Sequence, residues 1–89
     1  MLHKNFEVKG KVQGVWFRKY TLDKARSLGL TGFVENRKDG SVYLEAECSA
    51  SALSEMRQWL HEGSPQSRVE EVLVQDGGLK GFSDFQIRR

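Results

Sequence analysis

The sequence predicts an α+β fold in which two helices cover one face of a mostly antiparallel sheet. Three observations support this prediction. Apolar and polar residues alternate over residues 6–12 and 42–48, as in half-buried strands. Apolar residues recur at helical spacing over residues 18–28 and 50–60. The dipeptide Asp39-Gly40 tolerates the positive φ angles of a tight hairpin turn between two strand segments.

The first half of the chain is organised around a glycine turn. Residues 6–12 predict the first strand, and Gly14 interrupts it. A helix is expected from about residue 18 to residue 28, with Gly29 as its stop signal. Residues 30–37 then predict a second strand.

The second half repeats this order. Residues 38–41 predict a hairpin turn, and residues 42–48 a third strand. Ser49 or Ser51 can cap a second helix, which Gly63-Ser64-Pro65 ends. Two further strands are expected, around Val69, Val72 and Val74 and at Phe85 and Ile87. The resulting order βαββαβ, with a short C-terminal strand, is that of a ferredoxin-like two-layer sandwich.

Composition limits the range of functions. The 89 residues suit a single domain, 1–89, and a net charge of +2 is too small to indicate nucleic-acid binding by itself. The lone Cys48 excludes an intramolecular disulfide, and the chain has neither a signal-peptide pattern nor a membrane-spanning apolar segment. We therefore expect a cytoplasmic monomer that does not bind membranes. Glu45, Glu47, Glu70 and Glu71 are interpreted as solvated strand positions rather than as an acid/base pair.

Residues 10–18, GKVQGVWFR, carry the chemical signal. They run from a strand through a glycine turn to an arginine at a helix start. Successive unpaired N–H groups in such a turn form an anion-binding concavity, to which the helix N-terminus adds positive potential. An arginine at its rim offers a planar fork of donors to phosphate oxygens. The segment therefore predicts a phosphoryl-binding site.

The chain resembles the acylphosphatase family over nearly its full length. Residues 10–18 match the family's phosphate-loop signature, and residues 32–42, GFVENRKDGSV, match its second signature. The resemblance extends to Leu28-Gly29-Leu30 and to residues 83–87, SDFQI. It implies hydrolysis of small-molecule acyl phosphates to a carboxylate and inorganic phosphate, without a metal or organic cofactor.

The resemblance also implies the site residues. Arg18 would bind the phosphoryl group together with the backbone of the loop, and Asn36 would orient the attacking water. The loop consists of Gln13, Gly14, Val15, Trp16, Phe17 and Arg18. Glu35 departs from the family pattern, and alternation along a strand places its side chain on the face opposite Asn36.

The chemistry of these residue types agrees with this substrate. Phosphoryl transfer passes through a loose transition state that is stabilised by positioning and electrostatics. A carboxylate departs without a proton, so an arginine, an amide and backbone N–H groups suffice. A phosphate monoester would instead require an acid or a metal.

Two other functions compete with hydrolysis. An RNA-binding sheet of the RRM type would need stacking aromatic residues at a spacing that this sequence lacks. The second alternative is a catalytically weak module that binds acyl or carbamoyl phosphates, like the domain that begins the hydrogenase maturation proteins. Because this chain ends soon after the matching segment, we expect a free-standing enzyme.

Overall fold

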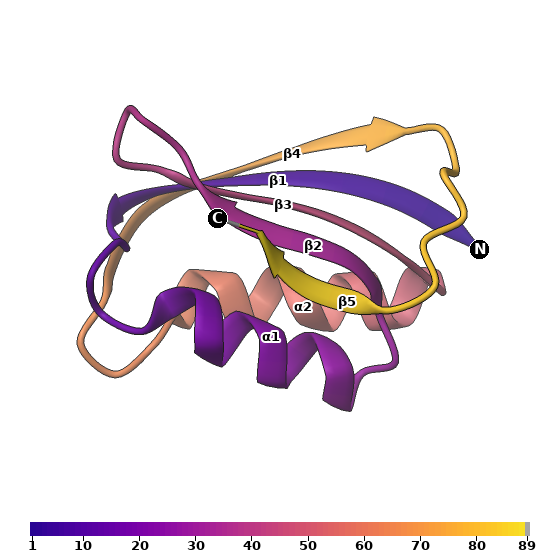
Figure 1. The fold of residues 1–89 in the computed structure, drawn as a ribbon, viewed down its shortest axis with the longest axis horizontal. Helices are drawn as coiled ribbons and strands as arrows, with labels where there is room; N and C mark the ends of the chain where they lie inside the picture. Colours follow the sequence, from indigo (N-terminus) through magenta and orange to yellow (C-terminus); the bar gives the residue numbers. More distant parts are fainter. Residues whose placement is uncertain (89) are drawn as a thin grey trace.

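The computed structural model describes residues 1–88 and consists of one sheet with two helices on the same face (Figure 1). The predicted α+β, ferredoxin-like architecture is confirmed, and the elements follow in the predicted order. They are β1 (Leu2–Lys11), α1 (Phe17–Ser27), β2 (Thr31–Asn36), β3 (Val42–Cys48), α2 (Ala50–Glu62), β4 (Arg68–Gly77) and β5 (Phe85–Arg88).

The sheet has the strand order β4-β1-β3-β2-β5. β1 and β3 form its centre and pair antiparallel, with Phe6 opposite Leu44. β5 is added beside β2 and runs parallel to it, with Val34 opposite Ile87. The C-terminal strand thereby lies at the edge next to α1, where it can contribute to a site at the start of that helix.

The two helices form because their apolar residues share one face. α1 buries Leu22 and Ala25, and α2 buries Leu53, Met56 and Leu60. The Ser49 hydroxyl accepts a hydrogen bond from the backbone N–H of Ala52 and caps α2 as predicted. Neither helix within residues 1–88 is long and apolar enough to span a membrane.

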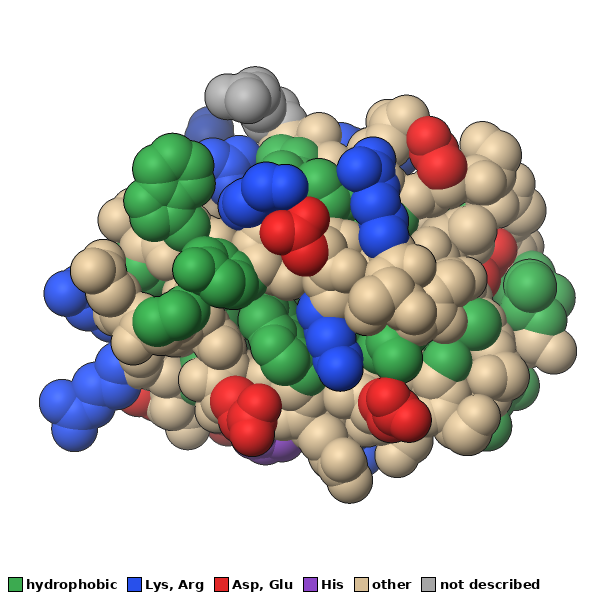
Figure 2. Space-filling view, turned by 90° about the horizontal axis from the view of Figure 1, so that it is seen from below, with side chains coloured by type: hydrophobic (Ala, Val, Ile, Leu, Met, Phe, Trp, Pro, Cys, Tyr) green, Lys and Arg blue, Asp and Glu red, His purple; other side chains and the backbone are tan. Residues whose placement is uncertain are grey.

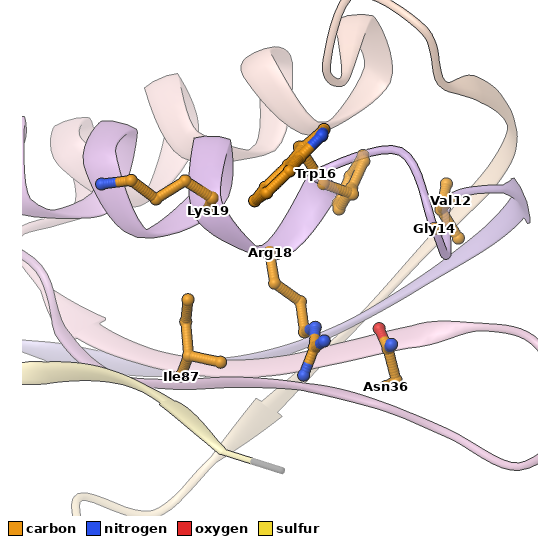
Figure 3. A pocket seen from close by; sticks show the side chains of 8 residues that line it. Val12, Gly14, Trp16, Arg18, Lys19, Asn36 and Ile87 are labelled. Carbon is orange, nitrogen blue, oxygen red and sulfur yellow. The ribbon is translucent and has the colours of Figure 1, made fainter.

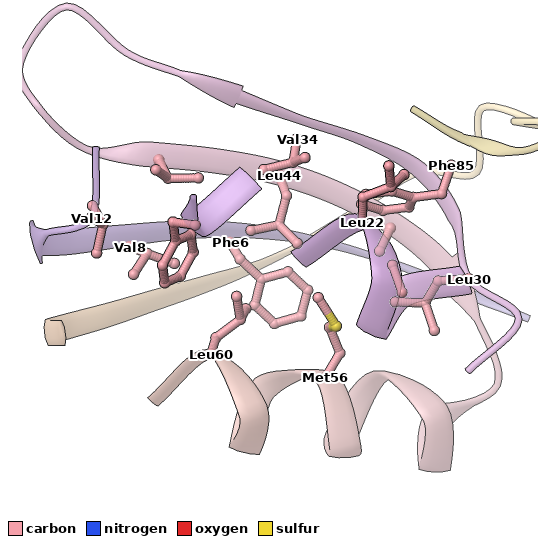
Figure 4. Close-up of a cluster of buried hydrophobic side chains, with 14 of the residues drawn as sticks. Phe6, Val8, Val12, Leu22, Leu30, Val34, Leu44, Met56, Leu60 and Phe85 are labelled. Carbon is pink, nitrogen blue, oxygen red and sulfur yellow. The ribbon is translucent and has the colours of Figure 1, made fainter. Parts of the chain in front are cut away.

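The core lies between the helices and the sheet (Figure 4). Its fully buried members include Phe6 and Val8 on β1 and Leu44 on β3, which pack toward Met56 and Leu60 on α2. Outside the core, acidic and basic side chains are interspersed over the helix-covered face (Figure 2).

A β-bulge redirects the end of β1 toward the glycine turn. The pairing of β1 with β4 shifts register between Lys9 and Gly10. Gly10 has φ 128°, and a Cβ atom at this position would lie 2.1 Å from the carbonyl oxygen of Arg68. Only glycine permits this approach, so the first glycine of the motif shapes the path of the chain into the loop.

The interpretation of Glu45 and Glu47 as solvated was wrong. Their side chains lie on the sheet face opposite the helices, yet Glu45 is 6% exposed and Glu47 is 1% exposed. Glu47 accepts hydrogen bonds from the backbone N–H groups of Lys80, Gly81 and Phe82. The connection between β4 and β5 therefore covers this face, which the alternation pattern of β3 could not reveal.

Candidate active site

A cavity of about 500 Å³ opens where β1 ends, α1 begins and β2 ends (Figure 3). This volume falls within the usual range for small-molecule sites. Five of the predicted site residues line it, together with three residues that were not predicted. The lining consists of Val12, Gly14, Trp16, Phe17, Arg18, Lys19, Asn36 and Ile87.

The loop between β1 and α1 contains two left-handed residues. Gly14 has φ 74°, and Trp16 has φ 60° and ψ 18°. Left-handed residues next to right-handed ones turn successive N–H groups toward a common point and form an anion-binding nest. The backbone geometry thus suits the phosphoryl group that the sequence predicted for residues 13–18.

The start of α1 has a strongly positive electrostatic character. Trp16 occupies the N-cap position without a side-chain hydrogen bond, and the first turn contains no acidic residue. The first backbone N–H groups of a helix have no intrahelical partner and carry partial positive charge. Arg18 and Lys19 add full positive charges at this end, so the helix start favours a bound anion.

Two polar side chains hold the loop in place. The Gln13 amide donates hydrogen bonds to the carbonyl oxygens of Arg37 (2.7 Å) and Ser41 (2.9 Å) in the β2–β3 hairpin. The buried Ser64 hydroxyl donates to the carbonyl oxygen of Val15 at 2.9 Å. Gln13 and Val15, both predicted in the phosphate loop, are absent from the cavity lining and contribute through these contacts instead.

Arg18 projects from the first turn of α1 into the space between the helix and the sheet (Figure 3). Its side chain is partly buried, and Nη1 donates to the carbonyl oxygen of Arg88 on β5 at 3.4 Å. This single long hydrogen bond leaves most of the guanidinium donors available. The fork is therefore held near the loop and can still bind oxygen atoms of a ligand.

Asn36 is the last residue of β2 and lies exposed at the cavity, on the same side of the sheet as Arg18 (Figure 3). Glu35 points away as predicted: its carboxylate lies 3.4 Å from Nε of Arg37. The hairpin beyond Asn36 is fixed by Asp39, whose carboxylate accepts from the hydroxyl and the backbone N–H of Ser41. These two hydrogen bonds hold the pKa of Asp39 below its usual value.

Three residues at the site or in contact with its loop lie outside the two predicted motifs, and two of them arrive through tertiary structure. Lys19 is adjacent to the motif, Ile87 arrives through the pairing of β5 with β2, and Ser64 follows α2. Ser64 was interpreted only as part of a helix stop. Within residues 1–88, no group of three His, Cys, Asp or Glu side chains is placed to hold a metal ion.

Comparison with known proteins identifies the family of this chain. The acylphosphatase family model matches residues 4–87. An acylphosphatase of Mannheimia succiniciproducens is 48% identical over 88 residues, which span 98% of each chain. The crystal structure of acylphosphatase from Bacillus subtilis superimposes with a TM-score of 0.98 at 37% identity, with full coverage of both chains.

A more distant structural relative is a full-length HypF crystallised in its phosphate- and nucleotide-bound form. It matches 99% of this chain with a TM-score of 0.88 at 25% identity, but the match spans only 12% of that protein. The family model and the relatives of similar length decide the assignment. This chain belongs to the acylphosphatase family, whose members are hydrolases that act on acyl phosphates.

Proposed function

We propose that this chain hydrolyses acyl phosphates by metal-free attack of a water molecule that Asn36 orients on a phosphoryl group held by Arg18 and the loop. The observation that carries the proposal is the convergence of three elements on one cavity. The start of α1 provides Arg18, the loop provides Gly14 and its neighbours, and the end of β2 provides Asn36.

The phosphoryl group is held by backbone N–H groups of residues 13–18 and by the Arg18 guanidinium. These donors surround the nonbridging oxygens, where charge develops in a loose transition state. They are fixed before the substrate binds, because Gln13 ties the loop to the hairpin and Ser64 ties it to the segment after α2. Little reorganisation is then needed during the reaction.

The Asn36 carbonyl accepts a hydrogen bond from the water and directs its oxygen toward phosphorus. A new P–O bond forms as the bond between phosphorus and the acyl oxygen breaks, and the bonding electrons leave with the carboxylate. The proton lost by the water passes to phosphate or to solvent. No side-chain acid is required, because the carboxylate is a weak base.

The whole chain 1–89 is proposed to act as one acylphosphatase-like domain, as a monomer in the cytoplasm. Its substrate is a small-molecule acyl phosphate, and neither a cofactor nor a nucleic acid takes part.

The test is hydrolysis of benzoyl phosphate by the wild type and by Arg18→Gln, with chelator present and folding checked by circular dichroism. We expect metal-free turnover in the wild type and a loss of at least about 10²-fold in the variant, the usual effect of removing a transition-state donor. Arg18→Lys should also lose most activity, because an ammonium group lacks the bidentate fork. Turnover by Arg18→Gln at the wild-type rate would contradict the proposal.

The likeness to a segment of HypF gives the second candidate function, a module that binds acyl or carbamoyl phosphates without efficient turnover. Turnover separates the two functions, and thermal unfolding with inorganic phosphate shows whether the site binds phosphate. A ligand that binds only the folded state raises the Tm. A phosphate-induced rise that Arg18→Gln abolishes, without turnover of any acyl phosphate by the wild type, would favour the module.

A further inference from the structure

Trp16 is the one non-glycine residue with a positive φ angle within residues 1–88, at φ 60° and ψ 18°. This left-handed conformation costs an ordinary L-residue free energy, since Cβ crowds the following carbonyl. The indole does not recover that cost by packing, because Trp16 is 74% exposed. A strained backbone that carries an exposed aromatic ring points to a function for that ring.

The position of the ring indicates which function. Trp16 lines the cavity that holds Arg18 and Asn36, and it stands at the N-cap of α1. In the view of Figure 3, Trp16 lies above Arg18 and Ile87 lies to the left of Arg18. Ile87 is itself only partly buried, so both offer apolar surface beside the phosphoryl site.

The cavity has more room than a phosphoryl group needs. One phosphorus and three oxygens occupy at most about 120 Å³ if each atom is given the ~30 Å³ of a liquid water. The cavity measures about 500 Å³. Most of its volume is therefore available to the acyl part of the substrate.

The charges around the cavity indicate whether an anionic or an apolar acyl group would bind there. Lys19 is the remaining cation of the lining, and its Nζ lies 2.9 Å from the carboxylate of Asp23 one turn further along α1. An anionic acyl group would have to compete with this carboxylate. The apolar surfaces of Trp16 and Ile87 carry no such competitor.

We infer that Trp16 and Ile87 form an acyl-group subsite that selects acyl phosphates with an aromatic or other bulky apolar acyl group. This inference rests on the proposed function and names its substrate class. Trp16 acts as a specificity-determining residue: its ring contacts the acyl group and does not take part in the chemistry at phosphorus.

The test compares kcat/KM for benzoyl phosphate with kcat/KM for acetyl phosphate in the wild type and in Trp16→Asn. Asparagine tolerates the left-handed conformation, so the loop can keep its path. Effects on phosphoryl binding apply to both substrates and cancel in the ratio. We expect the benzoyl-to-acetyl ratio to fall about 3- to 10-fold, as for loss of an aromatic contact at an open site. Trp16→Gly provides a second variant if Trp16→Asn does not fold.

Tyr20→Ala is the matched control, since Tyr20 is an exposed aromatic residue in the first turns of α1 that does not line the cavity. The benzoyl-to-acetyl ratio of kcat/KM in Tyr20→Ala should equal that of the wild type. An unchanged ratio in both folded Trp16 variants would overturn the inference. It would also be overturned if Trp16→Asn or Lys19→Gln impaired hydrolysis of succinyl phosphate more than that of benzoyl phosphate, because the subsite would then select an anionic acyl group.

A binding measurement separates this inference from the proposed function. Phenacylphosphonate and acetonylphosphonate replace the bridging oxygen of the two substrates by CH₂ and cannot be hydrolysed. Calorimetry should give the wild type a preference for phenacylphosphonate that Trp16→Asn reduces by a similar factor. If the wild type hydrolyses neither substrate but keeps this preference, the proposed hydrolysis fails and the subsite stands. If the preference is absent, the subsite fails whatever the turnover.

Discussion

Asn36 is positioned by its strand, and within residues 1–88 its side chain forms no hydrogen bond to the cavity wall. It ends β2, where its backbone pairs with Val42, and its side chain lies exposed at the cavity. The amide is therefore placed by the sheet and faces water, as a water-orienting group requires. Orientation of the nucleophile matters chiefly in the transition state.

Asn36→Ala should lower kcat by about 10²-fold, the typical effect of a misplaced reacting group, while KM changes little. Steady-state kinetics with benzoyl phosphate measure both constants. Gln75→Ala, which removes an exposed amide on β4, serves as the control and should behave like the wild type. A rise in KM at constant kcat would assign Asn36 to substrate binding instead.

The strain at Trp16 also has a consequence for stability. The left-handed conformation at φ 60° costs asparagine less free energy than it costs alanine. Both substitutions remove the same exposed indole. Trp16→Asn should therefore unfold with a free energy about 1 kcal/mol higher than that of Trp16→Ala. Urea unfolding of the two variants measures the difference. Equal stabilities would mean that the loop changes conformation once the ring is removed.

At the scale of elements, the connection between β4 and β5 is held to the sheet by several polar contacts. Glu47 on β3 accepts from the backbone N–H groups of Lys80 (2.5 Å), Gly81 (3.1 Å) and Phe82 (3.3 Å). His3 on β1 is its fourth partner, with Nδ1 at 2.8 Å. This carboxylate therefore fastens the segment between β4 and β5 to the centre of the sheet.

The same contacts change the acidity of both buried carboxyl groups. The backbone hydrogen bond from Lys80, together with the contact to His3, lowers the pKa of Glu47. For Glu45, burial alone would raise the pKa, but hydrogen bonds from the Lys80 ammonium and the Tyr43 hydroxyl outweigh it, and the pKa is lowered. Burial and the hydrogen bond to Glu45 raise the pKa of Tyr43 to about 12.

A lowered pKa in the folded state makes the stabilisation by Glu47 dependent on pH. It is fully present above the ordinary Glu pKa of about 4.3 and is lost as the pH falls through the lower folded-state value. At pH 7, Glu47→Gln should lower the Tm by at least about 5 °C. The neutral amide has one acceptor oxygen and no negative charge, so it cannot replace the carboxylate in all four contacts. The difference from the wild type should shrink as the pH falls below about 4.

Thermal unfolding followed by circular dichroism between pH 7 and pH 3 measures this effect. Glu71→Gln on the exposed face of β4 is the matched control and should change the Tm little. A Tm difference for Glu47→Gln that stays constant over the whole range would show that its charge does not hold the segment.

At the scale of the whole molecule, local patterns were enough to predict the order of the elements. The Asp39-Gly40 turn, the Ser49 cap and the alternation of residues 42–48 are each encoded within a few residues. Burial of Glu45 and Glu47 could not be predicted in this way, because it depends on a segment more than thirty residues away that has no periodic pattern.

The residues of the candidate site also differ in whether a local sequence pattern could predict them. Arg18 and Asn36 were found because each lies within a contiguous motif, and the structure brings both to one cavity. Ile87 and Ser64 lie in a predicted strand and a predicted helix stop, but they reach the site only through strand pairing and the segment after α2, so local patterns could not assign them to it. The catalytic functions of Arg18 and Asn36 stay predictions that the kinetic variants test.

The mechanism as a whole predicts that activity is independent of divalent metal ions. The leaving carboxylate needs no Lewis acid, and the charge on the phosphoryl oxygens is met by Arg18, by backbone N–H groups and by the positive end of α1. Excess EDTA should therefore leave kcat/KM for benzoyl phosphate within about twofold of its value without chelator, since no transition-state donor is removed. Benzoyl phosphate hydrolysis before and after dialysis against EDTA measures this. Loss of activity that Mg²⁺ or Zn²⁺ restores would mean that a cation supplies part of the charge assigned here to the protein.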